Sequence, residues 1–102
     1  MSDLFGALAH PVRRKILALL RRRPMTAGEL AEAFDLAKPT LSGHFAVLKE
    51  AGLMSGTRRG TTITYHLNMS VLEEAAHLVM DLAGVDERKK KETGGWKRST
   101  AR

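Results

Sequence analysis

The residues whose types and spacing most clearly suggest a chemical role lie on one polar face within positions 38–49 of this 102-residue chain. Lys38 stands at its N-terminal end, and no carboxylate follows until Glu50. An ordinary surface helix would carry long side chains of both charges there. Small residues and hydroxyl groups instead suit a helix that lies against base edges in a DNA major groove. The members of this face are Lys38, Pro39, Thr40, Ser42, Gly43 and Ala46.

The same stretch has the apolar spacing of an amphipathic helix. Leu41, Phe45 and Leu48 recur at helical intervals and form one stripe. Pro39 suits the first turn of a helix, and Gly52 suits the position just past its end. The pattern predicts a recognition helix whose stripe faces the core. The simpler alternative is a surface helix whose outer face is small and polar without a function.

A second group of chemically capable side chains follows later in the chain. Glu74, His77 and Asp81 share one helical face and could bind zinc, above all across a dimer axis. Exposed helix faces are built from charged residues, however, so such trios often arise by chance. We therefore expect no metal site and no cofactor.

Two further observations argue against catalysis. The chain contains no cysteine, which excludes disulfides, thiolate metal sites and thiol chemistry. His10 and His66 fall in a predicted helix start and a predicted strand, and their spacing offers no nucleophile–base pair. We expect a binding protein rather than an enzyme.

Three helices are predicted ahead of the recognition helix. A short helix spans residues 3–9, and a second runs from Pro11 to about Arg22 with one apolar stripe. Thr26 and Glu29 have the spacing of a capping box and predict a third helix over residues 26–34. Because only a short linker separates it from the recognition helix, the two form a helix-turn-helix pattern.

After Gly52 the apolar period changes from helical to alternating, which predicts strands over residues 53–57 and 61–67. Arg58 and Arg59 lie in the predicted turn between them. A β-hairpin with a basic tip beside a recognition helix is a wing, and its arginines would reach phosphates or the minor groove. A merely solvated hairpin tip is the alternative.

The last predicted helix covers residues 70–83, and Ser70 and Glu73 have capping-box spacing at its start. Its apolar face is wider than a small core requires, and the first helix is also apolar. Both ends of the chain together therefore predict a two-fold dimer interface. Its predicted residues are Leu4, Phe5, Leu8, Leu72, Ala75, Val79 and Leu82.

These elements add up to a mainly α fold with a β-hairpin wing, a winged helix-turn-helix in the order α-α-α-α-β-β-α. Residues 1–83 form one domain for DNA binding and dimerisation, and residues 84–102 form a basic tail, either a helix extension or disordered. The net charge is +6, yet residues 1–83 hold 10 Lys/Arg against 8 Asp/Glu. Local clusters, rather than bulk charge, therefore support nucleic-acid binding.

The sequence shows no apolar run of membrane-spanning length and no basic start typical of a secretory signal. We therefore expect a cytoplasmic protein without membrane insertion.

Taken in order, the segments LAHPVRRKILALL, MTAGELAEAFDLAKPTLSGHFAVLKEAGL and GTRRGTTITYHL resemble the ArsR/SmtB family of winged-helix transcriptional repressors. The resemblance covers residues 4–83, and within the family it is strongest to a branch of small autorepressors. It implies a homodimer that binds a palindromic operator in double-stranded DNA and represses its own or a neighbouring operon.

Carried over by position, the family's DNA contacts fall on the recognition helix and the wing. His44 lies at the shoulder of the helix, where it either touches a phosphate or packs at the edge of the core. His10 replaces the Asp that many members have before the proline, and Asp would cap the second helix better. The implied contacts are Lys38, Pro39, Thr40, Ser42, Gly43, His44, Arg58 and Arg59.

The sensor sites of the family are where this sequence departs from it. Arsenic and cadmium sensors carry a cysteine-containing motif in the third helix, and zinc sensors carry paired ligands on the last. Here the third helix has no thiolate and the last has only His77.

Three hypotheses remain open. The first is an autorepressor that occludes a promoter. The second is a metal- or ligand-responsive repressor of the same fold, which a zinc titration of the protein–operator complex would reveal. The third is a repressor sequestered by a protein partner, because the similar branch answers to a membrane anti-repressor.

Overall fold

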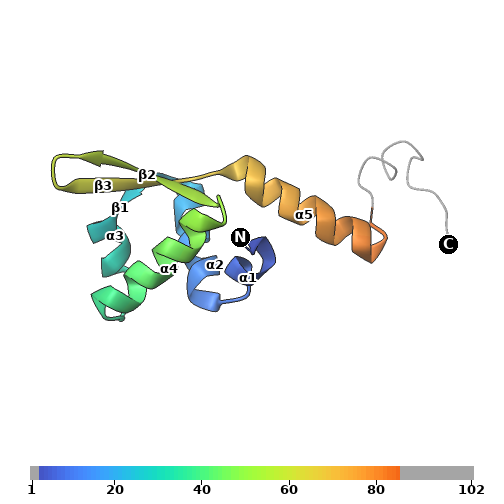
Figure 1. Cartoon of the computed structure of the whole chain (residues 1–102), viewed down its shortest axis with the longest axis horizontal. Coiled ribbons are helices and arrows are strands. Elements are labelled where there is room, and N and C mark those ends of the chain that lie inside the picture. The colour runs from blue at the N-terminus through green and yellow to red at the C-terminus, as the bar shows by residue number, and fades with distance from the viewer. Residues whose placement is uncertain (1–2, 86–102) are drawn as a thin grey trace.

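The computed structural model describes residues 3–85, and most of the predicted basic tail lies outside that part. Figure 1 shows the hairpin and the last helix projecting in opposite directions from a helical body. This is the predicted winged helix-turn-helix with one added strand. The elements are α1 (Leu4–Leu8), α2 (Pro11–Arg22), β1 (Met25–Thr26), α3 (Ala27–Glu32), α4 (Lys38–Glu50), β2 (Met54–Arg59), β3 (Thr62–Leu67) and α5 (Met69–Ala83).

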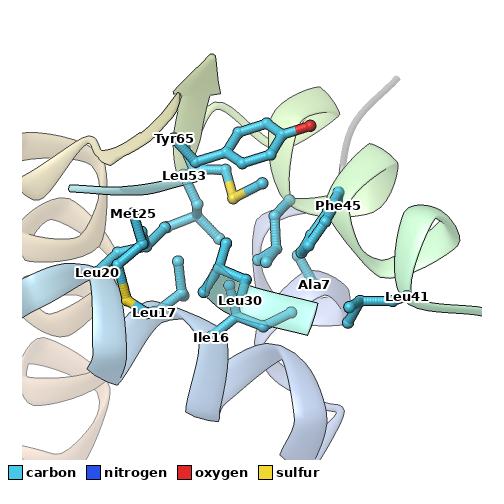
Figure 2. Close-up of a cluster of buried hydrophobic side chains, with 12 residues drawn as sticks. Ala7, Ile16, Leu17, Leu20, Met25, Leu30, Leu41, Phe45, Leu53 and Tyr65 are labelled. Carbon is cyan, nitrogen blue, oxygen red and sulfur yellow. The ribbon is translucent and has the colours of Figure 1, made fainter. Parts of the chain in front are cut away.

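One core joins the helices to the sheet, as Figure 2 shows. The apolar stripe of α4 enters this core as predicted: Leu41, Phe45 and Leu48 are all buried. The rings of Phe45 and Tyr65 lie 5.0 Å apart between centroids, which joins α4 to β3. The rotation of α4 about its own axis is therefore set by buried contacts.

The sheet has three strands in the order β1-β3-β2, both pairs antiparallel. The two wing strands were predicted, but the short β1 was not. In β1, Met25 pairs with Tyr65 and Thr26 pairs with Thr64. A two-residue strand is too short to show an alternating pattern, and the pairing depends on residues about forty positions away. As a result β3 is the central strand of the wing.

The hairpin turn also differs from the prediction. β2 continues through Arg58 and Arg59, which pair with Ile63 and Thr62 of β3. The turn itself is Gly60–Thr61, because Gly60 adopts a φ of 62° that favours glycine. The two arginines therefore lie in the strand and point to opposite faces of it.

The two predicted capping boxes had different outcomes. At α3 the box is present: Glu29 N–H donates to Thr26 Oγ1 at 3.1 Å, and Thr26 N–H donates to Glu29 Oε1 at 2.9 Å. The second bond is the main reason that the pKa of Glu29 lies below its usual value. The α3 helix still ends at Glu32, two residues earlier than predicted.

The capping box predicted at Ser70 is wrong. Asn68 is the N-cap of α5, and Ser70 Oγ donates to Asn68 Oδ1 at 2.9 Å instead of capping the helix. Asn68 N–H donates to Leu53 O at 2.9 Å, so the chain stays tied to the body up to that residue and the helix begins directly after it.

A matched pair of substitutions tests this difference. Thr26→Ala removes a cap bond and should lower the free energy of unfolding by about 1 kcal/mol. Ser70→Ala should change it by less than about 0.5 kcal/mol, because its hydroxyl caps no helix. Urea unfolding followed by circular dichroism measures both. Equal losses would contradict the assignment.

Candidate nucleic-acid interface

The outer face of α4 is open. Lys38, Pro39, Thr40, Ser42 and Gly43 are all exposed, while the apolar stripe on the other side of the helix is buried. Pro39 occupies the first turn, where its missing N–H leaves no hydrogen bond unmade. The structure therefore brings five of the six implied α4 contacts onto one accessible surface.

Gly43 lies in the middle of α4 without an internal reason to be glycine. A Cβ built there would meet nothing within 4 Å. Glycine inside a helix costs about 1 kcal/mol relative to alanine. The packing of the chain does not require this cost, so the bare position fits close approach by an external surface.

Gly43→Ala separates stability from binding. The substitution should raise the free energy of unfolding by up to about 1 kcal/mol. It should also weaken operator binding about tenfold or more, because a methyl group stands where the groove approaches. Thermal unfolding and fluorescence anisotropy with an operator duplex measure the two effects.

Gly28→Ala in α3 is the matched control, because its Cβ would meet only Thr26 Oγ1, at 3.9 Å. Because Gly28 lies in the first turn of α3, beside Lys38 and Ser42 but not on the outer face of α4, Gly28→Ala should weaken operator binding less than Gly43→Ala does. Operator affinity that is undiminished in Gly43→Ala would contradict a close approach at this position.

His44, the sixth implied contact, packs at the edge of the core. It is half-buried, its Nδ1 lies 3.1 Å from Arg13 Nη1, and its ring centroid lies 4.4 Å from that of His10. Burial is the main cause that lowers the pKa of His44, and the charges of His10 and Arg13 act in the same direction. Because a guanidinium only donates, the neutral ring accepts at Nδ1 and carries its proton on Nε2.

His10 itself caps α2. Its Nδ1 accepts a hydrogen bond from Val12 N–H at 3.1 Å, so the residue serves in the place where Asp was expected to be better.

The wing and the end of α4 border an open groove that carries two cations. Arg58 and Arg59 are exposed on β2, and Lys49 stands on the last turn of α4 with its Nζ 5.9 Å from the centre of the Tyr65 ring. Sequence reasoning missed Lys49, although its place next to a predicted basic wing was a usable signal. The groove is lined by Lys49, Met54, Ser55, Gly56, Arg58 and Ile63.

Gly56 lets β2 lie close to the side chains of β3 beside this groove. A Cβ there would lie 3.0 Å from Tyr65 Cε1 and 3.1 Å from Ile63 Cγ2, closer than ordinary contact. Residues 3–85 contain one ion pair, between Arg23 and Glu29. No carboxylate in that part of the chain therefore pairs with Arg58 or Arg59.

Arg13 and Arg14 of α2 both donate hydrogen bonds to the short α1 helix, although only Arg13 is partly buried. Arg13 is half-buried, and it donates from Nε to Ala7 O at 2.8 Å and from Nη2 to Gly6 O at 3.1 Å. Arg14 donates to Leu8 O at 2.8 Å. Both side chains thus satisfy carbonyl groups of the short α1 helix, which has no basic residue of its own.

The predicted dimer residues divide into three groups by exposure. Ala75 is 2% exposed and lies inside its own protomer, so its side chain is not available to a partner. Phe5, Val79 and Leu82 are exposed by 44%, 51% and 88%, and so is Leu78, which is not among the predicted residues, by 43%. The remaining predicted residues, Leu4, Leu8 and Leu72, are partly buried against the core.

Glu74, His77 and Asp81 are exposed on α5. Among the described residues, no three potential ligands are close enough to hold a metal ion. The same part of the chain contains no helix both long and apolar enough to cross a membrane.

A capped α3, a tight turn, an α4 with an open polar face and an arginine-bearing hairpin define a winged helix-turn-helix protein. A family described as a helix-turn-helix domain matches residues 8–57. The chain is 42% identical over 81 residues to the transcriptional repressor SdpR of Bacillus subtilis (strain 168). The matched stretch covers 79% of this chain and 90% of that repressor.

Two further comparisons agree. The HTH-type transcriptional repressor SmtB of Mycobacterium tuberculosis (strain ATCC 25618 / H37Rv) is 38% identical over 80 residues, which is 78% of this chain and 57% of that repressor. The crystal structure of an ArsR family transcriptional regulator is 30% identical, with a TM-score of 0.74 over 79% of this chain and 89% of that one. The chain therefore belongs to the ArsR/SmtB family of DNA-binding transcriptional repressors, which are not enzymes.

Proposed function

We propose that this protein is a homodimeric autorepressor that occupies a palindromic operator and excludes polymerase from the promoter. The open face of α4 is the observation that carries the proposal. Its buried stripe fixes the helix in place, and its exposed side offers hydroxyl groups and a bare glycine to the major groove. Similarity to the repressor SdpR over most of both chains supports the repressor role.

Each part of the site has a separate task in this proposal. Thr40 and Ser42 read base edges beside Gly43, whereas Lys38, Arg58 and Arg59 meet phosphates or the minor groove. Two protomers would place their α4 helices in successive major grooves, about 34–36 Å apart or a multiple of that. A DNA contact by His44 stays a prediction. Because its Nδ1 already accepts a hydrogen bond from Arg13, such a contact would use another edge of the ring.

Selection of bound duplexes from a random pool tests the proposal as a whole. The expected product is a palindrome whose half-sites are separated by a whole number of helical turns, and it should occur in a promoter. A selected pool without symmetry, or without any enrichment over random DNA, would contradict it.

Two substitutions separate base reading from phosphate contact. Ser42→Ala should weaken operator binding about tenfold and leave binding to random DNA unchanged. Arg58→Ala should weaken both duplexes and lower the slope of log affinity against log salt by about 1, because one phosphate contact is lost. An unchanged salt slope in Arg58→Ala would contradict the phosphate assignment.

The dimer in this proposal uses the outer end of α5 together with α1. Phe5, Leu78, Val79 and Leu82 leave apolar surface exposed on a single protomer, and α5 projects from the body in Figure 1. Exposed apolar surface of this kind is usual at a protein–protein interface. A two-fold axis between α5 helices would also set the distance between the two α4 helices.

A charge introduced into this surface tests the dimer. Val79→Glu places a carboxylate in the apolar interface and should shift the monomer–dimer equilibrium toward monomer by tenfold or more, about 1.4 kcal/mol. His77→Glu adds the same charge on the opposite face of α5 and should leave the equilibrium unchanged. Sedimentation equilibrium measures both. Equal dissociation in the two variants, or a monomeric parent protein, would rule this interface out.

The other two hypotheses keep the same fold. Regulation by a metal gains no support from the described residues, and control by an anti-repressor protein stays a prediction.

A further inference from the structure

The Arg13 side chain connects three helices. It stands on α2, its Nε and Nη2 donate to the carbonyl groups of Ala7 and Gly6 in α1, and its Nη1 donates to His44 Nδ1 in α4. The distances are 2.8, 3.1 and 3.1 Å. A guanidinium is planar and presents its donors in a fixed fork, so three simultaneous bonds allow it little freedom.

The partners of Arg13 tie it to both halves of the proposed function. Ala7 is 1% exposed and anchors α1 in the core, while Phe5 of the same helix stays exposed at the proposed dimer surface. His44 lies on α4, one residue after Gly43 and two after Ser42. The guanidinium therefore links the helix that would meet the partner protomer to the helix that would enter the groove.

His44 is held from a second side by His10. The two rings are 4.4 Å apart and inclined by 55°, and His10 is itself fixed by accepting a hydrogen bond from Val12 N–H. His44 thus contacts both His10, the N-cap residue of α2, and the guanidinium of Arg13. Because Arg13 is also bonded to α1, the position of His44 is coupled to the position of α4 relative to α1.

We propose that Arg13 is a positioning residue for operator recognition: through His44 it fixes the orientation of α4 relative to α1, and so the spacing of the two recognition helices in the dimer. The assignment rests on the proposed function. Arg13 contacts no base in this role. Its loss should alter how strictly the dimer requires one half-site spacing, without altering the general attraction to DNA.

Arg14 supplies the matched control. It is the neighbouring arginine and donates to Leu8 O of α1 at 2.8 Å, but no hydrogen bond of the described structure joins it to α4. Arg14→Gln therefore removes an equal charge and an equal kind of bond to α1 while leaving the link to α4 in place.

The test compares Arg13→Gln, His44→Leu, the double variant and Arg14→Gln on three duplexes. These are the selected operator, the same operator with one base pair inserted between its half-sites, and a random duplex. Arg13→Gln and His44→Leu should each bind the operator about tenfold more weakly, and the double variant should lose little more. The preference for the native spacing should fall in Arg13→Gln, in His44→Leu and in the double variant, whereas Arg14→Gln should retain it.

His44→Leu keeps the test valid if Arg13→Gln does not fold, since it breaks the same link and leaves the bonds to α1 intact. Circular dichroism at the assay temperature confirms folding. Equal weakening of all duplexes by Arg13→Gln with a shallower salt slope would make Arg13 a phosphate contact and overturn the proposal. An undiminished preference for spacing in both single variants would overturn it as well. A parent protein that does not distinguish operator from random DNA would instead refute the proposed function itself.

Discussion

Burial of one stripe on α4 is the constraint on which the rest of the site depends. Leu41, Phe45 and Leu48 are 3%, 7% and 0% exposed, and Phe45 also meets Tyr65 of the central strand. Losing a buried leucine costs about 2–5 kcal/mol, a large part of the stability of a small domain. α4 therefore cannot rotate about its axis without unfolding the core, and its polar face must point outward.

The other parts of the interface are arranged around that fixed helix. β3 packs its Tyr65 against α4 and pairs with β2, which carries Arg58 and Arg59 alongside. Gly56 lets the strand pass close to the Tyr65 ring, and Lys49 faces the adjoining groove. Arg13 separately joins α1 to His44. The α4 helix thus has the cations of the wing beside it and is joined to α1 by the hydrogen bonds of Arg13.

The helices and the outward face of α4 could be predicted because their patterns are local. The spacing of Leu41, Phe45 and Leu48 can be recognised without the rest of the chain. Thr26 and Glu29 are three residues apart and bond within one helical turn. The same local pattern failed at Ser70: the N-cap of α5 is Asn68, whose N–H donates to the distant Leu53 O, a contact that no local spacing reveals. Arg13 and His44 are 31 positions apart, so no spacing rule could reveal their contact.

The central claim is that the small polar face of α4 enters the major groove. Backbone amide NMR of the protein titrated with its selected operator duplex tests it most directly. The largest shifts are expected at the amides of residues 38 and 40–44 and at Arg58–Thr61, with smaller changes at Glu73 and Glu74 on the polar face of α5. Shifts concentrated on α5, with residues 38–44 unchanged, would contradict it.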